Sequence, residues 1–208
     1  MLSDRFNVAL GYAELAHRTQ TRKGSDIPYV SHLLGVCALV LEHAGDEDQA
    51  IAALLHDAVE DQGGVPRLRE IARLFGARVA RIVECCTDAY LQPKPPWEER
   101  KKLYLATLKD HDPDSWLVAS ADKLYNARSV LIDYRTLGEE LWERFNGGRD
   151  GTLWYYREVA DELLRLMPSD ITRNLDTIIT ELETLTALDN LEREMREGVD
   201  STQPRLSR

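Results

Sequence analysis

Apolar residues recur along most of the chain with the spacing of an α-helix. In the first segment, Phe6, Ala9, Leu10 and Ala13 are three or four residues apart, which predicts a helix over about residues 4–20. Residues 28–43 carry apolar side chains on a broader face, as expected of a central helix. Residues 50–55 are apolar without interruption and predict a buried helix. No segment alternates with the period of two that is typical of a strand.

Glycine, proline and aspartate mark the ends of these segments. Gly45 closes the second helix, and Asp46 is a suitable N-cap for a third helix that continues to Gly63. Further helices are expected at 67–75, 77–88, 97–109, 112–134, 137–145, 152–167 and 170–188. The sequence therefore predicts an all-α fold, a single helical bundle of roughly ten helices over residues 1–187. Residues 188–208 are expected to form a partly disordered C-terminal extension.

Bulk composition narrows the classes of function. The chain has 208 residues, 43% of them hydrophobic and 30% charged, and a net charge of −10. This acidity argues against nucleic-acid or membrane-surface binding. There is no apolar run of about 18 residues and no signal-peptide pattern at the N-terminus. The three cysteines lack metal-site spacing and indicate reduced thiols. We therefore expect a cytoplasmic protein with neither nucleic acid nor membrane as a partner.

Four ionisable residues follow the buried segment at 50–55. His56 and Asp57 are neighbours and point to adjoining sectors, while Glu60 and Asp61 each lie four residues further on, about one helical turn. Such side chains are costly to bury unless something binds them, and a divalent cation is the obvious candidate. The alternative is a capped, solvated helix end.

Two more residues extend this pattern. His32 lies in the central helix, where a lone histidine is more often a core residue than a ligand. Asp122 follows small residues suited to close packing, and Lys123 is its alternative partner. With His56 and Asp57 they make a set of two histidines and two aspartates. Imidazole and carboxylate donors without a thiolate suit Mn²⁺, Fe²⁺ or Zn²⁺.

The order of these residues resembles the HD-domain superfamily of metal-dependent phosphohydrolases. More specifically, it resembles the (p)ppGpp hydrolase domain of RelA/SpoT proteins and its stand-alone forms, the metazoan SpoT homologue and the bacterial small alarmone hydrolases. The resemblance covers about residues 5–180. It is carried by the ordered motifs His56-Asp57-x-Val59-Glu60-Asp61 and Asp122-Lys123-Leu124-x-Asn126.

The resemblance implies roles for the residues of these motifs. One divalent ion, typically Mn²⁺ with Fe, Zn, Co, Ni or Mg as alternatives, is expected to bind His32, His56, Asp57 and Asp122. Glu60 and Asp61 are expected to be catalytic residues that handle water and proton transfer. These roles agree with elementary chemistry, because a bound cation lowers the pKa of its water and a nearby carboxylate can deprotonate it.

A second group of residues is expected to bind substrate. Arg22 and Lys23 precede Gly24 in a basic loop, which is either an ordinary solvated turn or a contact for phosphate or a purine ring. The resemblance places the matching arginine and lysine around the nucleotide base, and Asn126 near the sugar. Tyr155 resembles an aromatic residue that closes the pocket. Tyr156 and a purely structural aromatic cluster are the alternatives.

These expectations favour hydrolysis of the 3′-diphosphate of (p)ppGpp to GDP or GTP and pyrophosphate. The partner would be a small phosphorylated nucleotide, and a homodimer is left open. One alternative is another phosphohydrolase activity at the same centre: an NADPH 2′-phosphatase, a nucleotidase or a cyclic-nucleotide phosphodiesterase. Another is a non-enzymatic alarmone-binding or antitoxin-like protein, which loss of Glu60 or Asp61 would have favoured; both residues are present.

Overall fold

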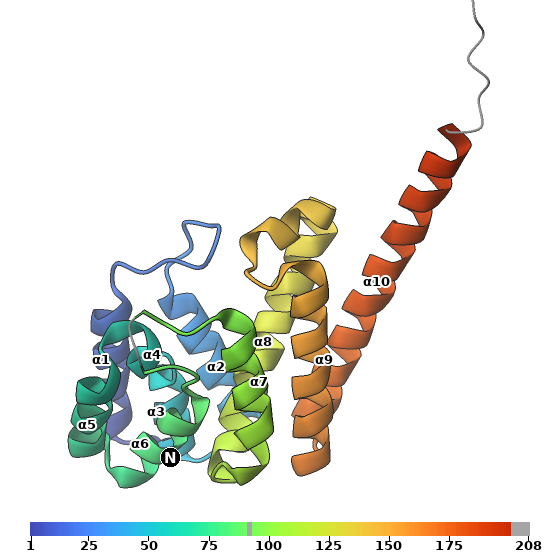
Figure 1. Ribbon diagram of the computed structural model, residues 1–208. Coiled ribbons are helices and arrows are strands. Elements are labelled where there is room, and N and C mark those ends of the chain that lie inside the picture. Colours follow the sequence, from blue (N-terminus) through green and yellow to red (C-terminus); the bar gives the residue numbers. More distant parts are fainter. Residues whose placement is uncertain (91–92, 201–208) are drawn as a thin grey trace, which may run out of the picture.

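The computed structural model describes residues 1–90 and 93–200, with the side chains of 197–200 left out. Helices account for the fold, and the described residues contain no strand, so the all-α prediction is confirmed (Figure 1). The helices are α1 (Asp4–His17), α2 (Val30–Glu42), α3 (Glu47–Leu55), α4 (Ala58–Gln62), α5 (Gly64–Phe75), α6 (Ala77–Cys86), α7 (Trp97–Thr107), η1 (Leu108–Asp110), α8 (Asp114–Leu137), η2 (Gly138–Arg144), α9 (Gly148–Leu166) and α10 (Asp170–Asp200).

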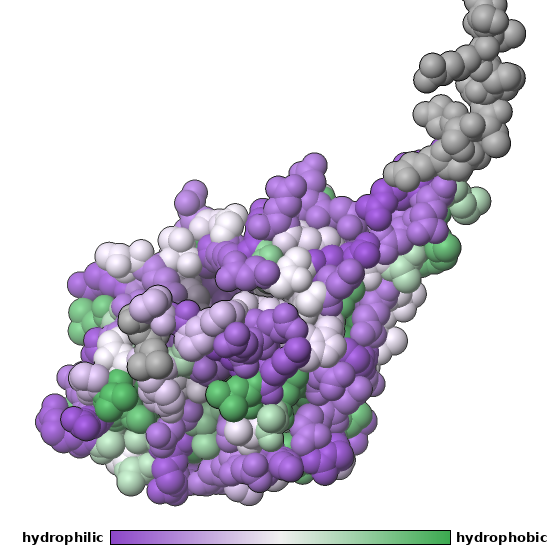
Figure 2. Space-filling model, viewed as in Figure 1, coloured by the Kyte–Doolittle hydropathy of each residue, from purple (hydrophilic) through white to green (hydrophobic). Residues whose placement is uncertain are grey.

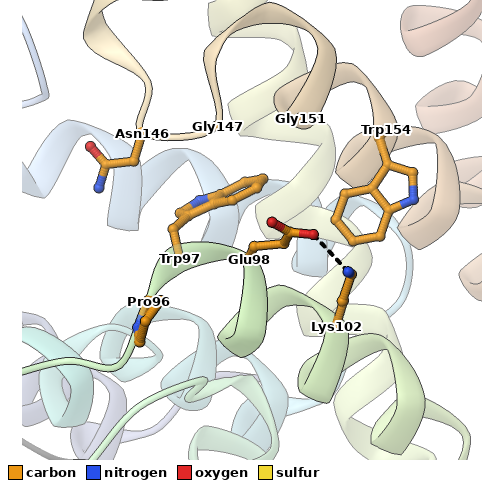
Figure 3. A pocket seen from close by; sticks show the side chains of 8 residues that line it. All are labelled: Pro96, Trp97, Glu98, Lys102, Asn146, Gly147, Gly151 and Trp154. Carbon is orange, nitrogen blue, oxygen red and sulfur yellow. Dashed lines mark ion pairs between the residues drawn. The ribbon is translucent and has the colours of Figure 1, made fainter.

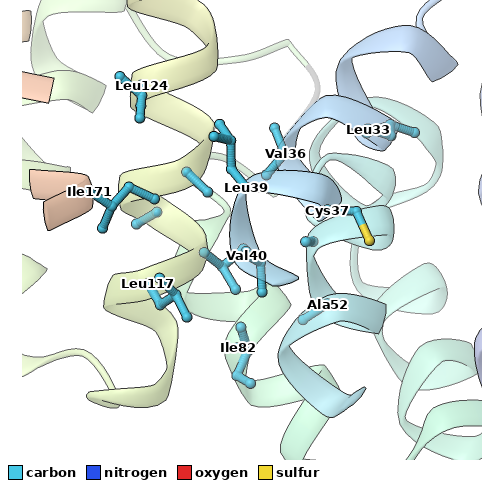
Figure 4. Close-up of a cluster of buried hydrophobic side chains, with 14 of the residues drawn as sticks. Leu33, Val36, Cys37, Leu39, Val40, Ala52, Ile82, Leu117, Leu124 and Ile171 are labelled. Atoms are coloured by element: carbon cyan, nitrogen blue, oxygen red, sulfur yellow. The ribbon is translucent and has the colours of Figure 1, made fainter. Parts of the chain in front are cut away.

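Helix α3 lies at the centre of the molecule. Each residue from Ala50 to Leu55 is fully buried, which confirms the interpretation of the uninterrupted apolar run. Contacts with α1, α2, α6 and α8 surround α3 on all sides. Figure 4 shows side chains of α2, α6 and α8 meeting there, with Ile171 of α10 packed on the far side of α8. The predicted N-cap is also present, since the Asp46 side chain accepts a hydrogen bond from the Gln49 amide.

Helix α10 continues past residue 188, an extension that the sequence left open. It packs on α8 and α9 and then extends beyond the helical body (Figure 1). Its distal part carries exposed apolar side chains of Leu188, Leu191 and Met195, whereas the face drawn in Figure 2 is mostly hydrophilic. The division at residue 187 and the partly disordered extension over residues 188–208 stay predictions. Helix α10 includes residues 188–200, and residues 201–208 lie outside the described residues.

The predicted third helix is interrupted at His56 and Asp57. Helix α3 ends at Leu55 and α4 begins at Ala58, because Asp57 adopts φ −93° and ψ −7° rather than regular helical angles. The Asp57 carbonyl still accepts a hydrogen bond from the Asp61 amide at 3.0 Å. The one-turn relation between Asp57 and Asp61 is therefore kept across the interruption.

The basic loop between α1 and α2 is a short hairpin. Thr21 and Pro28 form an isolated antiparallel bridge, and the Arg22 amide donates to the Ile27 carbonyl at 2.8 Å. Gly24 has φ +74°, a conformation that side chains with a Cβ rarely adopt, and this glycine makes the turn possible. The loop therefore presents its cations from a defined backbone.

Gly35 sets the distance between α2 and α8. A Cβ atom built there would lie 1.9 Å from Cε2 of Tyr125. We expect Gly35→Ala to destabilise the fold by about 2 kcal/mol, as overpacking typically does, and to lower Tm by roughly 4–8 °C for a domain of this size. Thermal unfolding followed by circular dichroism measures this. Gly11→Ala is the matched control, because its Cβ would meet nothing within 4 Å, and its Tm should not fall.

The three cysteines of the chain are unpaired. Cys37 is buried, Cys85 and Cys86 are half-buried, and all three are free thiols. Burial raises the pKa of the Cys37 thiol to about 11, which leaves it protonated and weakly reactive.

Among the described residues, no helix combines the length and the apolar character that crossing a bilayer requires.

Candidate metal and active site

Four predicted ligand residues from three parts of the fold converge at one point. His32 comes from α2, His56 and Asp57 from the turn between α3 and α4, and Asp122 from α8. The two histidine Nε2 atoms are 3.2 Å apart. Asp57 Oδ2 lies 3.4 Å from His32 Nε2 and 3.0 Å from His56 Nε2. Asp122 Oδ1 lies 3.3 and 3.5 Å from the same nitrogens.

This spacing fits a single metal ion. An ion with bonds of about 2.1 Å brings adjacent ligand atoms to roughly 3.0–3.4 Å from one another. Ligand atoms of His32, His56 and Asp57 lie within 4.8 Å of one another. Asp122 is not in that group, but its Oδ1 approaches both imidazole nitrogens from α8. Two imidazole nitrogens and carboxylate oxygens suit a borderline divalent cation. The chemistry of the donor set therefore fits a divalent metal ion.

Neighbouring groups fix the orientation of these side chains. His56 Nδ1 lies 2.8 Å from the Ala53 carbonyl, which can only accept, so Nδ1 carries the hydrogen and Nε2 is left free. The Tyr29 hydroxyl donates to Asp57 Oδ2 at 2.6 Å. Asp122 accepts from Asn126 at one oxygen and pairs with Lys123 at the other, each at 2.6 Å. Such supporting bonds orient metal ligands.

The directions of the pKa shifts indicate that the centre of the ligand set favours a positive charge. Burial lowers the pKa of His56, but the carboxylates of Asp57 and Asp122 outweigh burial and hold it well above the ordinary value of an imidazole. Burial raises the pKa of the Asp57 carboxyl, yet His56 and His32 outweigh this and hold it well below its usual range. A divalent cation bound there would supply the positive charge that the carboxylates favour, and both imidazoles would then be neutral.

The predicted catalytic carboxylates lie on α4, beside the metal ligands in sequence. Glu60 is mostly buried and bonds to Lys94 at 2.7 Å, while Arg100 lies 3.7 Å from the same oxygen. Burial raises the pKa of Glu60, the Asp88 carboxylate raises it further, and Lys94 opposes both. Asp61 pairs with Lys94 at 3.1 Å. A carboxyl with a raised pKa is suited to accept and return a proton.

A cluster of cations beside these carboxylates was missed by the sequence interpretation. Lys94 contacts Glu60 and Asp61, and Arg100 and Lys101 pair with Asp88 at 2.5 and 2.6 Å. Burial raises the pKa of Asp88, but Lys101 and Arg100 outweigh burial and hold it at about 2. The signal was present in the charged segment at 97–109, but charge alone does not distinguish a buried face from a solvated one.

The predicted substrate residues are brought together only in part. Arg22 donates to Asn126 Oδ1 at 2.7 Å, and Asn126 donates in turn to Asp122, so these two residues adjoin the ligand set. The Arg22 guanidinium also lies 5.7 Å from the Tyr29 ring centre. Lys23 is exposed and lies 5.6 Å from the ring centre of Phe145, with no contact to the ligands.

Both tyrosines of α9 are buried near the site. The Tyr155 ring lies 4.7 Å from Lys101 Nζ and 6.0 Å from Lys123 Nζ, so this residue packs against the cation cluster. Burial raises the pKa of Tyr156, and charges of Lys123, Asp122 and Arg22 also act on it. Tyr155 thus faces the cations directly, while Tyr156 lies within the electrostatic reach of the ligand set.

A separate pocket opens at the N-terminal end of α7 (Figure 3). It has a cavity volume of about 640 Å³, and Trp97 and Trp154 dominate its lining. Trp97 also packs edge-on against Tyr155, with ring centres 6.2 Å apart. The lining of this pocket contains none of the predicted site residues.

Comparisons of the sequence and the fold with known proteins found several similar proteins. The family model described as HD domain matches residues 9–153. The human guanosine-3′,5′-bis(diphosphate) 3′-pyrophosphohydrolase MESH1 is 41% identical over 125 residues, which are 59% of this chain and 67% of the human protein. The Drosophila melanogaster protein of the same name is 34% identical over 137 residues, 64% of this chain and 74% of its own.

Two further matches have different coverage. The GTP pyrophosphokinase rsh of Brucella melitensis is 32% identical over 187 residues, and the match spans 85% of this chain but 24% of that protein. The solved structure described as "A metazoan ortholog of SpoT hydrolyzes ppGpp and plays a role in starvation responses" has a TM-score of 0.73 at 29% identity and covers 87% of this chain and 97% of its own. This chain therefore belongs to the HD-domain family, within the RelA/SpoT-type group that includes the MESH1 proteins.

Proposed function

We propose that this protein is a Mn²⁺-dependent 3′-pyrophosphohydrolase that converts (p)ppGpp to GDP or GTP and pyrophosphate. The observation that carries the proposal is that two carboxylates each lie 3.0–3.5 Å from the same two imidazole nitrogens. Glu60, on the helix that follows, pairs with a cluster of cations. The activity named for the MESH1 relatives and for the metazoan SpoT ortholog supports the same substrate. A donor set without a thiolate supports Mn²⁺ over softer metals.

Each group of residues has a distinct part in the proposed reaction. A divalent ion bound by His32, His56, Asp57 and Asp122 would supply an acidic water and offset charge on the phosphoryl oxygens. Glu60, whose pKa is raised by burial, holds the attacking water and takes its proton. Asp61 assists from the same helix. Water attacks the phosphorus bonded to the ribose 3′ oxygen, so the new P–O bond belongs to pyrophosphate. The bond between that phosphorus and the ribose oxygen breaks, and the oxygen leaves with GDP and takes up the proton that Glu60 accepted.

The cation cluster supports a substrate that carries several phosphates. Lys94, Arg100 and Lys101 are each less than one-third exposed, and their present partners are carboxylates rather than solvent. Partly buried cations attract phosphate more strongly than exposed ones, because solvent screens them less. The cluster therefore provides a basic region beside the predicted catalytic carboxylates, which suits a substrate with several phosphates.

A substrate screen separates this proposal from its alternatives. The Mn²⁺-loaded protein is assayed against ppGpp, NADPH, cyclic nucleotides and nucleoside monophosphates. We expect ppGpp to have the highest kcat/KM. A higher value for NADPH or a cyclic nucleotide would assign the centre to another phosphohydrolase. Binding of ppGpp without turnover of any compound would favour a non-enzymatic, alarmone-binding protein. Cytoplasmic location and a homodimer stay predictions.

Arg22 provides a test of substrate recognition. Loss of a hydrogen bond from a charged group costs about 1.5–3 kcal/mol, and each 1.4 kcal/mol is about tenfold in affinity. We therefore expect Arg22→Ala to lower kcat/KM for ppGpp by roughly 10- to 100-fold, with the metal content unchanged. Steady-state kinetics on ppGpp and on a small chromogenic phosphodiester measure this.

Arg18→Ala is the matched control for Arg22→Ala. Arg18 lies in the same region, is exposed, and pairs with Glu14, one helical turn away. Its replacement should leave both activities unchanged, because an exposed pair of this kind contributes little. Equal losses on both substrates in Arg22→Ala would mean that Arg22 shapes the metal site through Asn126 and does not recognise guanosine.

A further inference from the structure

Gln20 follows α1 and contacts a predicted catalytic carboxylate. Its Nε2 donates to Asp61 Oδ2 at 2.9 Å. Its Oε1 accepts from Gln62 Nε2 at 2.7 Å and lies 2.7 Å from His17 Nδ1. The Gln62 amide nitrogen donates to this oxygen. If the Gln20 amide were reversed, its nitrogen would face the Gln62 nitrogen, and its oxygen would face the Asp61 carboxylate. The network therefore fixes which end of the Gln20 amide faces Asp61.

His17 anchors this network in the protein interior. It is the last residue of α1 and is 2% exposed. Its ring stacks on Tyr29, with ring centres 5.1 Å apart and planes 20° apart. The Tyr29 hydroxyl in turn donates to Asp57 Oδ2 at 2.6 Å. The buried His17 ring thus contacts Tyr29, which orients Asp57, and Gln20, which orients Asp61.

Asp61 needs such support because its other partner is shared. Lys94 lies 3.1 Å from Asp61 Oδ1 but 2.7 Å from Glu60, and Asp61 itself is near the surface. A flexible lysine pulled toward Glu60 does not by itself fix the second carboxylate. Gln20 holds the opposite oxygen from the segment that follows α1, so the Asp61 carboxylate is held from both sides.

We propose that Gln20, anchored by His17, is a positioning residue that fixes the Asp61 carboxylate relative to the metal ligand Asp57. The inference rests on the proposed function, because that function gives Asp61 its part in handling water and protons. It adds α1 to the elements that build the site. Neither residue touches the reacting atoms; both act through their neighbours.

Gln20→Leu tests the inference, because leucine keeps most of the volume but none of the hydrogen bonds. Misplacing a reacting group by about 1 Å can cost about 100-fold, so we expect kcat to fall roughly 10- to 100-fold. KM, metal content and Tm should stay near those of the wild type. His17→Asn should keep activity well above that of His17→Leu, since the asparagine amide can replace Nδ1 as a donor to Gln20. Arg18→Ala again serves as the neighbouring control.

A double-mutant cycle shows whether Gln20 acts through Asp61. In an Asp61→Asn background, Gln20→Leu should have no further effect on kcat, because the group it positions is already changed. Additive losses in the cycle, or a normal kcat in Gln20→Leu alone, would overturn the inference. A fall in Tm or metal content that parallels the loss of kcat would make Gln20 merely structural and would also overturn it.

The same assays separate this inference from the proposed function. The kinetics use whichever substrate the wild type hydrolyses, including the chromogenic phosphodiester. A wild type that hydrolyses nothing would refute the proposed function and the inference together. An active wild type with an equally active Gln20→Leu variant would refute the inference alone.

Discussion

Asp57→Ala should lose its bound divalent ion and, with it, all measurable hydrolysis. Asp57 contributes a carboxylate 3.0 and 3.4 Å from the two imidazole nitrogens, and the remaining donors would be two neutral rings and Asp122. A metal ion contributes several kcal/mol to such a reaction, so we expect a loss on the order of 10³-fold or more. Metal analysis by mass spectrometry and ppGpp turnover measure the two effects on the same sample.

Asp161→Ala is the control for this experiment. Its carboxylate is exposed on α9 and pairs with Arg157, one helical turn away. Both metal content and turnover should equal those of the wild type. Full metal occupancy in Asp57→Ala would show that Asp57 is not a ligand, and normal turnover in a metal-free sample would show that the ion has no part in the reaction.

Glu60→Gln should keep the ion yet lose most turnover. Glu60 makes no contact with the four ligand residues within hydrogen-bond distance; its partners are Lys94, the Asp88 amide and, more distantly, Arg100. Glutamine keeps the shape of the side chain but cannot take a proton from water. General acid–base groups contribute about 10²–10⁴-fold, and single-turnover kinetics with measured metal content should show a loss of this order.

The matched control for Glu60→Gln is Glu98→Gln on α7. Glu98 is exposed and forms an i,i+4 pair with Lys102, so its charge matters little for the site. A Glu60→Gln variant with near-normal kcat would make Glu60 a structural partner of Lys94 rather than a catalytic residue.

Local patterns in the sequence were sufficient to predict the helical elements. The apolar run at 50–55 predicted a buried helix, and Asp46 predicted its start, because both signals act over a few residues. The interruption at His56 and Asp57 was not predicted. Tertiary contacts from α2 and α8 orient these two side chains, and no local propensity records that.

The grouping of the site residues depended on more than local pattern. His32 and His56 are 24 residues apart and lie on different helices, and periodicity cannot show that their Nε2 atoms approach to 3.2 Å. Resemblance to a known family supplied that grouping. It did not supply the roles of Tyr29 and Gln20, whose bonds to Asp57 and Asp61 are visible only in three dimensions. The pairing of Lys123 with Asp122, its neighbour in sequence, was already expected as one alternative.

The most direct test is hydrolysis of ppGpp by the Mn²⁺-loaded protein in ¹⁸O-labelled water, with products separated by chromatography and analysed by mass spectrometry. We expect GDP and pyrophosphate in equal amounts, the label in pyrophosphate, and no reaction after the metal is removed. The label follows from attack of water on phosphorus with departure of the ribose oxygen. Release of inorganic phosphate in place of pyrophosphate, label in GDP, or undiminished turnover without metal would contradict a metal-dependent 3′-pyrophosphohydrolase.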